Sequence, residues 1–158
     1  MEAQRDFTFL KGSDATIEIS LGDARLSLER EPPQHFDVLV IDAFSSDAIP
    51  VHLITSEAVR VYQRHLAPGG VIAFHVTNRF LNLIPVVEAL AAASGLHVIH
   101  IADDGPGSLA SRSDWLLLSE NEALLDRPEL ADFASAIEPR RDWRLWTDDF
   151  NNIVQVLK

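Results

Sequence analysis

Apolar runs alternate with amphipathic segments along most of the chain. The runs at 36–42, 71–76 and 96–102 are typical of strands buried on both faces, and 15–23 alternates apolar and polar residues like a further strand. Helical spacing marks 24–31, the segment from Thr55 or Ser56 to Pro68, and 82–95, which has Pro85 in its first turn and Gly95 at its end. This alternation predicts βαβ units and a parallel sheet.

The pattern changes after residue 103. A loop precedes an apolar run at 114–120, which we expect to return antiparallel because the loop is short. A helix at 127–137 and a last strand at 152–158 complete the predicted elements. The sequence therefore predicts an α/β fold, with a mostly parallel sheet and an antiparallel edge region, in one domain that covers 1–158.

Composition excludes several functions. The net charge of -11 disfavours binding to nucleic acid and favours a small polycation. No stretch of eighteen apolar residues is present, so we expect no membrane contact by this chain, and its beginning does not resemble a secretory signal. The absence of cysteine excludes disulfides and thiolate chemistry and is consistent with a cytoplasmic location.

Two carboxylates stand where the strand at 36–42 stops. Asp42 ends that strand and Asp47 lies in the following loop, where ligands of open α/β sheets collect. The pair could bind a cationic amine and accept its proton, or Asp42 could cap the loop while Asp47 is solvated. His75 ends the next apolar strand and could line the same cleft, or it could pack in the core.

The other polar residues give weaker evidence for a function. Asp23 could accept a hydrogen bond from an adenine amino group, or it could cap the helix that begins at Ala24. The six histidines form no metal-binding motif, and no GxSxG elbow supports a hydrolase built on the serines at 45 and 46. The "GPGS" stretch at 105–108 is a weak phosphate-loop candidate because no helical pattern follows it directly. We therefore expect no metal site.

Five segments in order resemble the spermidine synthase family. They are "LGDARLSLE", "FDVLVIDAFSSDAIPVHLIT", "LAPGGVIAFHVTNRFLNLIPVV", "DDGPGSLASRSDW" and "WTDDFNNIVQVL", and they are most similar to spermidine synthase-like domains attached to membrane-embedded segments in bacteria. The resemblance implies a partial S-adenosylmethionine-methyltransferase-like Rossmann sheet. It also implies aminopropyl transfer from decarboxylated S-adenosylmethionine, as co-substrate, to a small polyamine, with no further cofactor required.

The resemblance also implies residue roles. Asp23, with Ala24, takes the place of the family's adenine contact, and Asp42 that of the base acting on the attacking amine. Asp47 takes the place of the acid that holds the polyamine, with Ser46 and His75 beside it. The family spaces its two acids as D-x-x-D, whereas these two are five residues apart.

Parts of the family pattern are missing. The family's glycine-rich loop and ribose-binding acid precede the "GDA" strand, but the fourteen residues before Ala15 contain no GxG. We expect weak cofactor binding by this chain alone. Two alternatives stay open: an S-adenosylmethionine-dependent methyltransferase, and a non-catalytic binding or assembly domain.

The missing segments also affect the sheet. The family orders its strands 3-2-1-4-5-7-6, so the strand at 36–42 should lack its usual neighbours. We expect it to pair with 15–20, to be covered by 1–14, or to join two chains as a homodimer or edge-paired oligomer. We expect a cytoplasmic protein, and the resemblance allows a membrane tether in a longer form.

Overall fold

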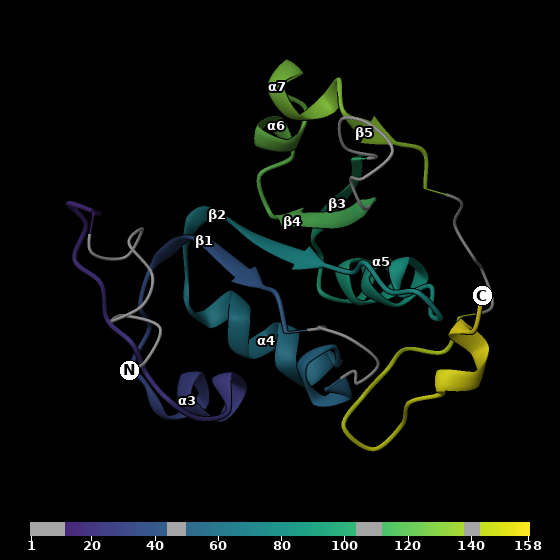
Figure 1. Ribbon diagram of the computed structural model, residues 1–158, viewed down its shortest axis with the longest axis horizontal. Helices are drawn as coiled ribbons and strands as arrows, with labels where there is room; N and C mark the ends of the chain where they lie inside the picture. Colours follow the sequence, from purple (N-terminus) through teal and green to yellow (C-terminus); the bar gives the residue numbers. More distant parts are fainter. Residues whose placement is uncertain (1–11, 44–49, 104–111, 138–142) are drawn as a thin grey trace.

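A five-stranded mixed sheet forms the centre of the fold. The structure is a computed structural model that describes residues 12–43, 50–103, 112–137 and 143–158. The strands are β1 (Phe36–Ile41), β2 (Leu66–His75), β3 (His97–Asp103), β4 (Ser113–Ser119) and β5 (Ala134–Ser135), in the spatial order β1-β2-β4-β3-β5 (Figure 1). β1 and β2 are parallel, and β4 runs antiparallel between β2 and β3. The α/β fold class is confirmed, and the returning strand lies inside the sheet.

Three helices follow the predicted pattern, and the first two of them begin at side-chain caps. They are α3 (Ala24–Arg30), α4 (Ser56–Arg64) and α5 (Ile84–Ala93), and they lie next to one another in a row in Figure 1. The hydroxyl of Thr55 accepts a hydrogen bond from the Ala58 N–H and caps α4. Pro85 opens α5, and Gly95 follows it with a φ of 69°. Local sequence signals therefore fix these helix positions.

The core lies between one face of the sheet and α4 and α5. Tyr62 of α4 is fully buried and its ring contacts Phe74 of β2. The neighbouring side chains of this core include Val59, Ile72, Val86, Val87, Leu90, Leu116 and Leu118. Side chains alternate across a strand, so the inner face of β2 carries Ile72 and Phe74 and its next residue, His75, faces the other side.

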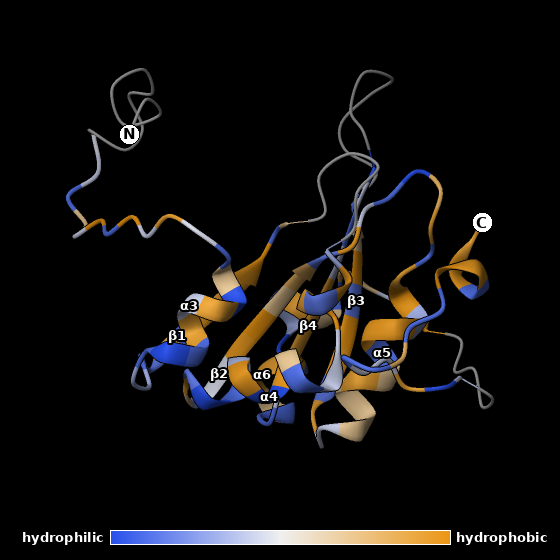
Figure 2. Ribbon diagram, turned by 90° about the horizontal axis from the view of Figure 1, so that it is seen from below, coloured by the Kyte–Doolittle hydropathy of each residue, from blue (hydrophilic) through white to orange (hydrophobic). Residues whose placement is uncertain are grey.

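The prediction of a strand at 15–23 is wrong. Residues 14–21 form no helix or strand, and all of them are exposed. Figure 2 shows this part of the chain extending away from the sheet before α3. A β-strand needs a neighbour for its backbone hydrogen bonds, and within the described residues none lies beside this segment. The expected pairing of 15–20 with the strand at 36–42 of the same chain is therefore absent.

The C-terminal predictions also need correction. The helix expected at 127–137 is shorter and covers only α7 (Pro128–Ala131), because Ala134–Ser135 pairs with β3 as β5. A short helix, α6 (Glu122–Leu125), precedes α7. In place of a last strand the chain forms the 3₁₀ helix η2 (Ile153–Val156), with one β-bridge from Leu157 to Leu81. The helix predicted to reach Pro68 ends at Arg64, because Leu66 already pairs in β2.

The predicted burial of β1 on both faces is wrong as well. Val38 is 57% exposed and Val40 is 52% exposed, while Ile41 is buried. Val38 and Val40 lie on the face of β1 opposite Leu39 and Ile41, and their exposure shows that the described residues leave this face open. In the same described part of the chain, no helix has the length and apolar character needed to cross a bilayer.

Candidate functional site

Asp42 and His75 meet at the carboxyl ends of two neighbouring parallel strands. Asp42 directly follows β1 and His75 is the last residue of β2. Asp42 Oδ1 and His75 Nδ1 are 2.7 Å apart, which is hydrogen-bond distance. Both lie outside the helix-covered core, with side chains 58% and 27% exposed. The structure therefore brings together two residues that the sequence proposed for one cleft.

An aromatic ring holds the imidazole in place. His75 stacks on Trp115 of β4, with ring centroids 4.6 Å apart and an interplanar angle of 18°. The register of β2 with β4 puts these two residues opposite each other. A carboxylate with a histidine on one side can accept a proton and bind a cation, and the ring fixes the direction of the imidazole.

Asp23 caps α3. Its Oδ1 accepts a hydrogen bond from the Leu26 N–H at 2.9 Å, and its Oδ2 lies 2.7 Å from His52 Nε2. The hydrogen bond from the Leu26 amide is the main reason why the pKa of Asp23 lies below its usual value, with a further contribution from His52. The alternative that Asp23 is a helix cap is thus observed, and a contact with adenine stays a prediction.

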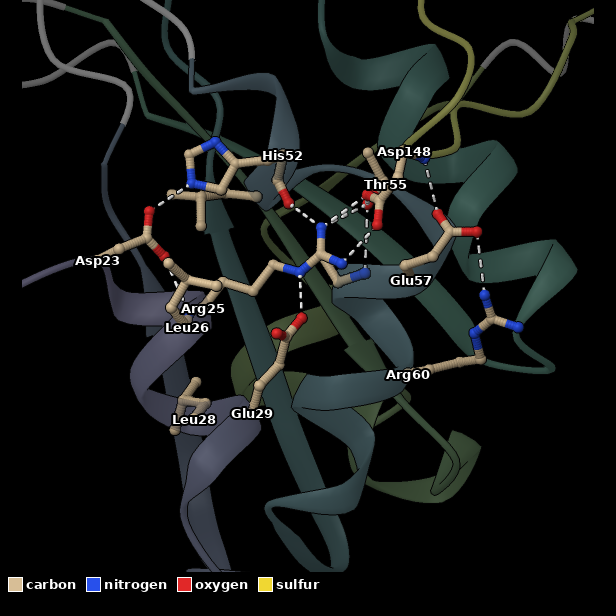
Figure 3. Close-up of polar contacts among 12 residues, drawn as sticks. Asp23, Arg25, Leu26, Leu28, Glu29, His52, Thr55, Glu57, Arg60 and Asp148 are labelled. Carbon is tan, nitrogen blue, oxygen red and sulfur yellow. Dashed lines mark hydrogen bonds and ion pairs between the residues drawn. The ribbon is translucent and has the colours of Figure 1, made fainter.

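A buried arginine joins α3 to the C-terminal part of the chain. The Arg25 guanidinium donates to both carboxylate oxygens of Asp148 at 2.7 and 2.6 Å, and to Glu29, the His52 carbonyl and the Thr55 hydroxyl (Figure 3). The hydrogen bonds with Arg25 are the largest cause of the lowered pKa of Asp148. This cluster, here called the Arg25 cluster, is a structural ion network that fixes α3 beside α4.

Two open cavities flank α3. The first is about 500 Å³ and has Asp23, Val51, His52 and the Arg25 cluster in its lining. The second is about 630 Å³ and is lined by Ala24 together with residues of 18–22 and β1. Asp23 and Ala24, which the resemblance assigns to one adenine contact, therefore line different cavities, and neither cavity is lined by Asp42 or His75.

A second histidine–aspartate pair is buried in the sheet. His100 Nε2 lies 2.9 Å from Asp114 Oδ1, and Arg112 donates to both oxygens of the same carboxylate. Burial acts to raise the pKa of Asp114, but hydrogen bonds from Arg112 and His100 outweigh it and leave the pKa below its usual value. The two pairs differ in access: His100 and Asp114 are shielded, and Asp42 is open to solvent.

The remaining predictions fall partly outside the structure. Ser46, Asp47 and the "GPGS" stretch lie outside the described residues. Within the described residues, no group of three or more histidine, aspartate or glutamate side chains is arranged to hold a metal ion. Sequence reasoning missed Trp115, although its place at the start of the strand predicted at 114–120 was a usable signal. It also missed Arg25 and Asp148, which are 123 residues apart.

Comparison with known proteins supports the fold and leaves the family open. No protein-family model matches the chain, and a search of curated proteins finds no match. The solved structures that match include a probable spermidine synthase from Corynebacterium glutamicum, with 23% identity and a TM-score of 0.53 over 80% of this chain and 55% of that one. The spermidine synthase from Thermotoga maritima gives 16% identity and a TM-score of 0.55 over 88% of this chain and 49% of that one.

A third match is a spermidine synthase in complex with the transition state analogue AdoDATO. It has 14% identity and a TM-score of 0.52, over 88% of this chain and 48% of that one. The chain thus spans about half the length of the spermidine synthases that it matches. At these identities the similarity is one of fold, and the chain has the fold of part of a spermidine synthase.

Proposed function

We propose that this chain carries the amine-activating part of a spermidine synthase-like aminopropyltransferase. The observation that carries the proposal is the 2.7 Å contact between Asp42 and His75 at the carboxyl ends of β1 and β2, in a sheet shared with spermidine synthases. Open α/β sheets bind their ligands at this end. The activity of a whole transferase is part of the proposal, because the chain spans about half of those proteins.

The proposed reaction needs a proton acceptor beside a cationic amine. An amine nitrogen attacks the aminopropyl carbon bound to the sulfonium of decarboxylated S-adenosylmethionine. The new C–N bond forms as the C–S bond breaks, and the sulfur keeps the electron pair and leaves as methylthioadenosine. Asp42 accepts the proton lost by the nitrogen, and His75 holds the carboxylate in position.

The other residues supply binding in this proposal. Asp47 and Ser46 follow Asp42 in the chain and are proposed to hold the distal cationic end of the amine. Asp23 is proposed to face adenine, which requires that it exchange its contact with His52 for the adenine amino group while it continues to cap α3. Ala24 lines the other cavity and has no part in this proposal. The lack of cysteine fits a cytoplasmic location.

A binding experiment tests the site without requiring turnover. The side-chain NMR signals of His75 and Trp115 would be followed as putrescine is added, in the wild type and in Asp42→Asn. We expect both signals to move in the wild type, and about tenfold weaker binding in Asp42→Asn, which keeps the shape and removes the charge. His100 is the internal control, since it is buried and paired with Asp114.

Turnover assays then identify the reaction. Putrescine would be incubated with the chain and either decarboxylated or ordinary S-adenosylmethionine, and product would be measured by mass spectrometry. Aminopropylated product that disappears in Asp42→Asn supports the proposal, and methylated product shows a methyltransferase. If His75 and Trp115 do not respond to millimolar putrescine and neither donor reacts, the proposal is wrong and a non-catalytic domain is favoured.

A further inference from the structure

The outer strand of the sheet presents an unusual amount of apolar surface. β1 has the sequence FDVLVI and pairs with β2 on one side only. Its other edge carries backbone groups with no strand beside them in the described part of the chain, and Val38 and Val40 are each more than half exposed. Soluble proteins normally protect such an edge with charges, proline or a covering element. This edge is therefore suited to receive another strand.

The same chain contains a strand-forming segment without a partner. Residues 15–21, here called the donor segment, have the sequence ATIEISL and alternate apolar with polar residues. They are extended and exposed, and Figure 2 shows them away from the body of the protein. Ile17, Ile19 and Leu21 are 39%, 46% and 79% exposed. The donor segment has seven residues and β1 has six, so their lengths match.

A groove separates the donor segment from β1. It is the cavity of about 630 Å³ that lies between the donor segment, α3 and β1, and its lining includes Glu18, Ser20, Gly22, Ala24, Ser27, Leu28, Phe36 and Leu39. Because the donor segment of the same chain stands across this groove, it leaves the edge of β1 uncovered. Open space is thus present between α3 and the side of β1 that carries Leu39.

We propose that a second copy of this chain fills the groove, and that two copies exchange their donor segments. Each copy has one unpaired segment and one unpaired edge, so a reciprocal exchange about a two-fold axis satisfies both and closes the assembly. Ile17, Ile19 and Leu21 of the incoming donor segment are the apolar side chains available to the groove, whose apolar lining includes Leu28, Phe36 and Leu39. Burial of these three side chains in each copy adds to the backbone hydrogen bonds that the edge of β1 gains from the donor segment.

The net charge opposes this association and predicts how the dimer responds to salt. Each copy carries a net charge of -11, so two copies repel each other over distances that salt screens. Pairing of β-strands and burial of valine and isoleucine depend little on salt. The dimer is therefore expected to strengthen as ionic strength rises, opposite to an association held by ion pairs.

Sedimentation equilibrium over a concentration series tests the exchange, with one variant on each side of the contact. Ile19→Pro removes a backbone N–H from the donor segment, and Val38→Glu puts a charge beside the β1 edge. Ser13→Pro is the matched control for the first, because it lies in the same exposed arm before the donor segment. Val154→Glu is the matched control for the second, because Val154 is 74% exposed and lies in η2.

The expected result is a monomer–dimer equilibrium that both test variants weaken by about tenfold or more and both controls leave within about twofold. Hydrogen exchange should show protection of 15–21 and 36–41 only at concentrations where the dimer forms. A monomer at every concentration would overturn the proposal, and so would protection of 15–21 in a monomer. A dimer insensitive to Ile19→Pro, or an open series of larger species, would overturn the reciprocal exchange.

Discussion

Replacement of Arg25 by methionine is expected to destabilise the fold by about 2 kcal/mol. Methionine keeps most of the buried stem and removes the guanidinium, which is the only cation shared by the carboxylates of Asp148 and Glu29 among the described residues of the Arg25 cluster. Arg25 is 8% exposed, but the side chains of its partners Asp148 and Glu29 are 42% and 37% exposed, so water replaces part of the lost hydrogen bonding. The substitution therefore breaks the ion pair and leaves carboxylates that solvent satisfies in part.

The magnitude follows from the exposure of the two partners. Removing one member of a fully buried ion pair costs about 3–5 kcal/mol. The Asp148 side chain is 42% exposed and keeps a hydrogen bond from the Thr55 hydroxyl at 2.8 Å, so solvent and Thr55 offset part of the loss. The expected cost therefore lies below that range, at about 2 kcal/mol. The matched control is Arg60→Ala, whose pair with Glu57 has an arginine side chain 67% exposed and should cost about 0.5 kcal/mol or less.

Urea unfolding followed by tryptophan fluorescence measures both variants. Trp146 is 1% exposed and lies two residues from Asp148, so its emission reports on this region. Circular dichroism provides the second probe that a two-state analysis needs, and protein concentration must be fixed because association changes apparent stability.

The pH dependence gives an independent check of the cause. Arg25 lowers the pKa of Asp148 in the folded state, so the stability from this pair is complete above the unfolded-state aspartate pKa of about 3.9 and is lost as pH falls through the lower folded-state value. The difference between wild type and Arg25→Met should be constant from neutral pH down to about 5 and should shrink below about 4. If Arg25→Met costs no more than Arg60→Ala, or if the difference grows in acid, the reasoning is wrong.

Three further predictions test the site and the sheet. Asp23→Ala should cost about 1 kcal/mol in unfolding experiments because it removes the cap of α3, whereas Asp23→Ser should cost less than half of that; equal losses would show that the cap is not the cause. Gly70→Ala should cost at least about 2 kcal/mol, since a Cβ there would lie 2.8 Å from the Phe36 carbonyl oxygen, and a neutral result in thermal denaturation would contradict the packing at the start of β2. Calorimetric titration of this chain alone with methylthioadenosine should show binding weaker than about 100 μM, because the chain spans about half of the synthases that it matches; micromolar binding would refute this.

The helices and the central strands were predictable because their signals are local. Thr55 and Pro85 mark the starts of α4 and α5 in the sequence, and the structure confirms both. A helix forms its hydrogen bonds within itself, so its caps and apolar spacing are sufficient to place it. The meeting of Asp42 and His75 was also predictable, because the ends of neighbouring parallel strands lie at one edge of the sheet.

The sequence by itself determined the α/β class, the positions of α3, α4 and α5, and the two residues of the candidate site. Only the tertiary structure decided which strand-like segments are strands: 15–21 has no neighbour, and 152–158 turns into η2 with one bridge to Leu81. It also decided that Val38 and Val40 face solvent and that Arg25 meets Asp148. The physical reason is common to these cases. A strand, a buried face and a long-range ion pair each require a partner that local sequence does not specify.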